Sequence, residues 1–118
     1  MLPSVLRDNL RLPVIASPLF IISHPQLTLA QCKAGVIGAF PALNARPESQ
    51  LDEWLAMITE ELDAHNRANP ERPAAPFAVN QIVHMSNRRL EHDLRLCVKY
   101  KVPVVISSLG AVPEVNAA

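Results

Sequence analysis

Four short apolar runs, each followed by a stretch with helical character, divide the 118-residue chain into four similar units. The runs are Pro13–Ser17, Val36–Phe40, Phe77–Asn80 and Pro103–Ser107. Each run is apolar in its middle and turns small or polar at its carboxyl end, as buried strands of parallel sheets do. Strands that alternate with helices predict parallel βα units. Such folds carry their chemistry at the carboxyl ends of the strands, so the candidate site lies there.

The fold class that this pattern predicts is α/β, with about four of the eight βα units of a TIM-type barrel. A complete (β/α)8 barrel needs about 250 residues. The length of 118 residues therefore fits either one small domain or half of such a barrel. In both cases we expect four parallel strands in sequence order, with the helices on one side of the sheet.

Composition and charge narrow the classes of function. Hydrophobic residues make up 49% of the chain, which is enough for a packed core. Lys and Arg together number 11, as do Asp and Glu, so the net charge is zero. A nucleic-acid partner is not expected, because phosphate binding needs a basic surface. Zero net charge also removes one barrier to self-association, which makes a homo-oligomer an open expectation.

The chain shows no sign of a membrane span or of a secretion signal. Its longest apolar stretch, Pro13 to Ser23, is too short to cross a bilayer and is interrupted by Pro18. The N-terminus has no signal-peptide cleavage pattern. We therefore expect a cytoplasmic protein without a membrane partner.

The cysteines, histidines and glycines point to no metal or phosphate site. Cys32 and Cys97 lack metal-type spacing and are expected to be reduced thiols in the core. Among the histidines only His84 follows a strand end, where either a surface position or a contact with substrate fits. The three glycines cannot form a Gly-rich phosphate loop.

Capping residues and apolar spacing predict the helices. The first runs from Pro25 to Ala34, and Gly35 ends it in the left-handed conformation. The second has Pro47 as its first residue, carries an apolar face through Leu62, and ends before a proline-rich loop that spans residues 65–76. The third begins at Ser86, and a fourth begins at Pro113.

The strand ends supply the candidate binding residues. Ser17, Pro18 and Leu19 follow the first run, where they either terminate a strand or form a wall against a flat ligand. Asn80 ends an apolar run, and a buried amide needs a partner, either the next loop or the polar edge of a heterocycle. Ser108 belongs to the small-residue turn after the fourth run. Asn44 closes the second unit and is interpreted as a turn residue.

In this order and spacing the motifs resemble those of nitronate monooxygenases, formerly called 2-nitropropane dioxygenases. The resemblance rests on residues 12–19, 32–41, 78–80 and 104–110, and its most specific part is the run from Lys33 to Asn44. It covers nearly the whole chain.

The resemblance implies an FMN-binding (β/α)8 barrel that oxidises alkyl nitronates with dioxygen. In the family an Ala-Pro-Met segment lies against the flavin ring, and Ser17-Pro18-Leu19 takes its place here. The family's flavin-contacting Asn matches Asn80, and Ser108 matches a small position on the fourth strand. The family's later Lys, its active-site His and its phosphate site follow the fourth strand. The resemblance therefore implies that residues 1–118 are the N-terminal half of such an enzyme and are inactive alone, with no catalytic acid or base among them.

Two other functions stay open at this stage. The first is an FMN-dependent barrel that reduces enoyl thioesters with a nicotinamide. The second is a non-catalytic α/β domain that acts as an interaction module.

Overall fold

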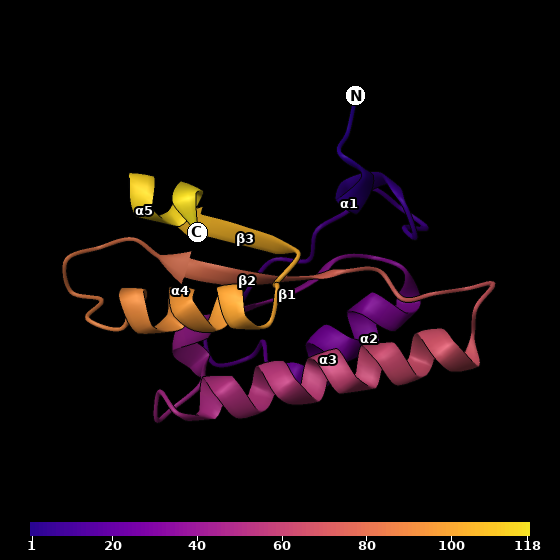
Figure 1. Cartoon of the computed structure of the whole chain (residues 1–118), viewed down its shortest axis with the longest axis horizontal. Coiled ribbons are helices and arrows are strands. Elements are labelled where there is room, and N and C mark those ends of the chain that lie inside the picture. Colours follow the sequence, from indigo (N-terminus) through magenta and orange to yellow (C-terminus); the bar gives the residue numbers. More distant parts are fainter.

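Three parallel strands in the order β1-β2-β3 form the sheet of this small α/β domain. They are β1 (Gly38–Pro41), β2 (Phe77–Ile82) and β3 (Val104–Ser108). The structure is a computed structural model that describes all residues from 1 to 118 (Figure 1). In register, Pro41 lies beside Asn80, and Asn80 lies beside Ile106. The strands therefore follow one another across the sheet in sequence order, as expected.

The prediction of a full strand over Pro13–Ser17 is wrong. Of the run Pro13–Ser17, only Ile15 pairs, in a single parallel bridge to Ile37 next to β1. Ala16 N donates to Ile37 O at 2.8 Å, and Ile37 N donates to Val14 O at 3.0 Å. Prolines at 13 and 18 bracket the run and have no N–H to donate, so the pairing stops after one bridge. The bridge still lies at the edge where the sequence places its first strand.

Three helices cover one face of the sheet: α2 (Pro25–Ala34), α3 (Gln50–Ala68) and α4 (Leu90–Lys99) (Figure 1). Alternate strand residues, including Phe40, Phe77 and Val79, point into this layer. They pack with Leu51, Leu55 and Ile58 of α3 and with Cys32 of α2. This face holds the larger of the two apolar clusters.

The opposite face carries a smaller cluster. Ile37, Ala39 and Ala78 are buried there, and Leu6 and Leu10 from the N-terminal segment pack on them. Leu6 belongs to the short helix α1 (Ser4–Arg7). The expectation of helices on one side only therefore holds for α2, α3 and α4 but fails for α1, because the leading segment folds back over the other face.

The helix boundaries agree with the capping signals at some ends and not at others. Helix α2 has the predicted bounds, and Gly35 ends it with a φ of 98°. Pro113 begins α5 (Pro113–Ala117), as expected. Helix α3, however, begins at Gln50 rather than at Pro47 and continues through His65 to Ala68. It can do so because the prolines that break helices begin only at Pro70.

The predicted start of α4 is also wrong. Ser86 does not cap this helix, which begins at Leu90. Instead, Ser86 Oγ lies 2.8 Å from His84 Nδ1, and Ser86 N donates to the same nitrogen at 3.2 Å. The side chain that could have capped the helix is thus bound in a turn within the preceding loop.

Candidate functional site at the carboxyl ends of the strands

Asn80 lies near the carboxyl end of β2, the central strand of the sheet, and is 6% exposed. Strand alternation places its side chain on the same face as Ala78, away from α2, α3 and α4. Its Nδ2 donates to Ile106 O and to Ser108 Oγ, both at 3.0 Å. These two bonds use both amide hydrogens, so only Oδ1 remains to accept a bond from a ligand.

Ser108 lies on the same face as Asn80. The other predicted residues, Ser17, Pro18 and Leu19, lie on the opposite side of β1. Ser108 is half-buried at the end of β3. Ser17 and Leu19 are exposed and Pro18 is half-buried, in the loop that follows the Ile15 bridge. Because all the strands are parallel, this loop and Asn80 lie at the same end of the sheet. The structure brings Asn80 and Ser108 into contact, whereas β1 lies between Asn80 and the segment that leads into Ser17–Leu19.

A buried ion pair that the sequence analysis does not predict connects the start of α4 to the segment that follows β1. Asp93 is fully buried, and Arg89 Nε lies 3.3 Å from its Oδ2. Arg89 also donates to Ala45 O at 2.6 Å and to Ala42 O at 3.2 Å. Helix α4 thereby holds the short helix η1 (Ala42–Asn44), which follows β1. The i,i+4 spacing of Arg89 and Asp93 was the available signal, but it is usually the mark of an exposed pair.

The remaining titratable groups form no reactive centre at this edge. His84 lies past β2 as expected, but it is exposed in the loop. No group of three His, Cys, Asp or Glu side chains is arranged to hold a metal ion. None of the helices combines the length and apolar character that a bilayer span requires.

Both cysteines are buried in the helical layer rather than at the strand ends. Burial raises the pKa of each thiol to about 11, although the Gly38 backbone lowers that of Cys32 and the Gln81 side chain lowers that of Cys97. Gln81 Nε2 donates to Cys97 Sγ at 3.3 Å. A thiol with so high a pKa is a poor nucleophile, which agrees with the expectation of core thiols.

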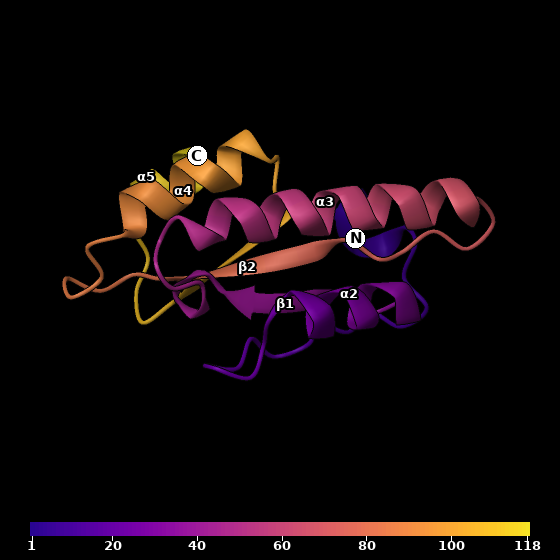
Figure 2. The same ribbon diagram turned by 90° about the horizontal axis from the view of Figure 1, so that it is seen from below.

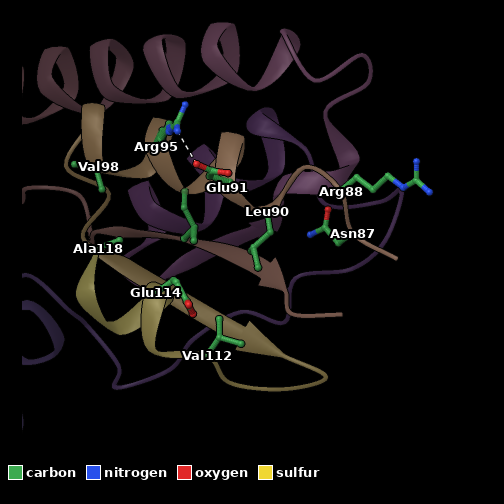
Figure 3. Close-up of a pocket in the computed structure, with 10 residues that line it drawn as sticks. Asn87, Arg88, Leu90, Glu91, Arg95, Val98, Val112, Glu114 and Ala118 are labelled. Atoms are coloured by element: carbon green, nitrogen blue, oxygen red, sulfur yellow. Dashed lines mark hydrogen bonds and ion pairs between the residues drawn. The ribbon is translucent and has the colours of Figure 1, made fainter. Parts of the chain in front are cut away.

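A cavity of about 740 Å³ lies between α4 and α5, on the helical side of the molecule (Figure 3). Its apolar wall includes Leu90, Leu94, Val98 and Val112, and the Glu91–Arg95 ion pair lies at its rim. It is a groove in the outer layer, separate from the face that carries Asn80. We therefore place the candidate site at the strand ends and not in this groove.

Comparison with known proteins supports the fold and no more. No protein-family model and no curated protein matches the chain. Among solved structures, the chain is similar to a mutant of FabK from Thermotoga maritima, with a TM-score of 0.67 and 18% sequence identity. The similarity covers 95% of this chain and 33% of that one, so the chain spans about a third of the length of FabK. The chain thus shares an arrangement of parallel βα units with part of a larger protein.

Proposed function

We propose that this chain forms the first βα units of an FMN-dependent oxidoreductase of the nitronate monooxygenase type. The observation that carries the proposal is the Asn80–Ser108 contact at the carboxyl end of a parallel sheet, with the loop that starts at Ser17 at the same end, on the other side of β1. Two observations support the assignment of these strands to a barrel. The strands follow sequence order, and the chain is similar to part of FabK over 95% of its length. When bound, FMN supplies electron transfer between an alkyl nitronate and dioxygen.

The residues present fit a flat ring better than a charged ligand. Asn80 offers one acceptor, Oδ1, which suits a ring N–H, because its Nδ2 is already bound to Ile106 O and Ser108 Oγ. Pro18 offers a rigid apolar surface, and the exposed Ser17 precedes it. In this arrangement Asn80 orients the ring, while Pro18 and Leu19 exclude water from one of its faces.

Flavin titration of the whole chain tests the proposal. Binding is followed by the quenching of flavin fluorescence. None of the proposed contacts involves the phosphate of FMN, so we expect riboflavin and FMN to bind with similar dissociation constants. Asn80→Ala removes the acceptor and weakens both ligands together by about 1–3 kcal/mol. The matched control is Asn69→Ala, at the end of α3, where the amide Nδ2 bonds only His65 O. Flavin fluorescence that does not change with the unsubstituted chain contradicts the proposal and favours an interaction module.

The choice of substrate needs a second measurement. Because residues 1–118 are expected to be inactive alone, the assay uses these residues as the first units of a complete flavin-loaded barrel. Dioxygen uptake that depends on an alkyl nitronate supports the proposed reaction. Oxidation of NADPH that depends on an enoyl thioester and consumes no dioxygen assigns the chain instead to a reductase of enoyl thioesters.

A further inference from the structure

The loop between the Ile15 bridge and α2 presents three large apolar side chains to solvent. Phe20, Ile21 and Ile22 are 56%, 74% and 60% exposed. The loop lies beyond the carboxyl end of β1, before α2 begins (Figure 2). Consecutive exposed apolar side chains are uncommon on a protein surface and mark a contact site when they are held in place.

The backbone of this loop is held in a costly conformation. Ile21 has a φ of 68°, in the left-handed region that a β-branched residue rarely adopts. Ile22 N donates to Phe20 O at 2.8 Å and closes a γ-turn around Ile21. Turns of this hand are rare and strained. Such strain persists only where surrounding interactions fix the conformation, and it concentrates at functional sites.

One side chain from the neighbouring unit provides most of this restraint. Asn44 Oδ1 accepts from Ile21 N at 3.0 Å. Its Nδ2 donates to Leu19 O at 3.0 Å and to Ser23 O at 2.7 Å. Both the oxygen and the nitrogen of the Asn44 side-chain amide therefore bond to backbone groups of the strained loop.

Two further contacts fix the ends of the same loop. Ser23 is fully buried, and its Oγ accepts from Leu19 N at 2.8 Å. The Arg46 guanidinium lies 5.2 Å from the centre of the Phe20 ring, within range of a cation–π interaction. Asn44 and Arg46 both follow β1, so the second βα loop determines the shape of the first.

We propose that Asn44 is a positioning residue that holds residues 19–23 as a preformed apolar rim of the strand-end site. The rim continues directly from Ser17 and Pro18. It therefore shields from water the apolar part of a flat ligand that lies on Pro18, at little entropic cost on binding. The inference rests on the proposed function for the identity of the ligand, and riboflavin is the probe.

The test compares Asn44→Ala with Asn66→Ala in the whole chain. Asn66 is a matched control, because its Oδ1 accepts a loop N–H, that of Ala74, at 2.7 Å, ahead of β2 at the opposite end of the sheet. Three measurements are made below the unfolding temperature of each variant: chymotrypsin cleavage after Phe20, hydrogen exchange of the amides of residues 17–23, and the dissociation constant of riboflavin.

We expect Asn44→Ala to accelerate cleavage and to raise the riboflavin dissociation constant, each by about tenfold, since bonds to three backbone groups are lost. Asn66→Ala should change neither by more than about twofold, because distant sites act independently.

Equal effects of Asn44→Ala and Asn66→Ala on cleavage and on riboflavin overturn the inference, as does increased exchange confined to Ile21 with residues 17–19 unchanged. If the unsubstituted chain binds neither riboflavin nor FMN, the proposed function is wrong. The contrast between the two variants in cleavage and exchange still decides whether Asn44 positions the loop.

Discussion

Asn80 and Ser108 lie on adjacent strands, and Asn80 Nδ2 donates a hydrogen bond to Ser108 Oγ at 3.0 Å. The second hydrogen of the same amide is bound by Ile106 O. The residue proposed to face a ligand is therefore also a cross-link between β2 and β3. Its two roles are separable, because the cross-link uses only Nδ2 and the proposed ligand contact uses only Oδ1.

Asn80→Ala should lower the free energy of unfolding by about 1–3 kcal/mol, because two hydrogen bonds are lost at a buried position. Ser108→Ala removes one of the two acceptors and should cost about 0.5–1.5 kcal/mol. Urea denaturation followed by circular dichroism measures both. Wild-type stability of Asn80→Ala would contradict the cross-link, whatever its effect on flavin.

Gly38→Ala should be more harmful than its size suggests. A Cβ at residue 38 would lie 2.3 Å from Thr28 O and 3.0 Å from Cys32 Sγ. Because Thr28 O is backbone, α2 must move away from β1, and we expect a loss of about 1–3 kcal/mol in the free energy of unfolding. Gly110→Ala is the control, since its Cβ would meet Val83 O only at 3.1 Å. Comparable denaturation midpoints for the two variants would show that α2 is not packed this closely.

The sequence predicts the order of the strands and the helix that packs most tightly on them. The bounds of α2 follow from Pro25 and from Gly35, because these residues act through local backbone geometry alone. The failures occur where a local signal has a competing use. Pro13 and Pro18 limit the first strand, and Ser86 binds His84 instead of capping α4.

The candidate site is less predictable than the fold, for a related reason. Asn80 could be selected as a buried amide, but its donors prove to be bound by protein groups on β3. Asn44 is indistinguishable from an ordinary turn residue in the sequence, because its partners, such as Ile21 N, lie more than twenty residues earlier. The Arg89–Asp93 pair follows the spacing of a surface pair, and only tertiary packing buries it. The local sequence pattern does not predict which distant residues a polar side chain will bond.

The two buried thiols predict a loss of stability at alkaline pH. The pKa of each is raised by burial from 9.0 to about 11, so the folded state keeps both protonated where the unfolded chain ionises. The stability is therefore complete below pH 9 and falls as the pH rises toward 11. Denaturation midpoints measured from pH 8 upward should show this slope, and Cys32→Ala should flatten it. In the native state neither thiol should react with Ellman's reagent at pH 8.

The unpaired edges of the sheet predict self-association. Val14 and Ile15, at one edge, are 46% and 45% exposed, and β3 forms the other edge with Ser107 exposed. Open strand edges recruit further strands, and zero net charge offers no repulsion against this. Light scattering should therefore report a mass that increases with protein concentration. Ile15→Lys places a charge at the edge and should shift the mass toward the monomer. Met85→Lys, in the loop after β2 where the side chain is 93% exposed, is the matched control and should leave the mass unchanged. A monomeric mass at every concentration would show that neither edge associates.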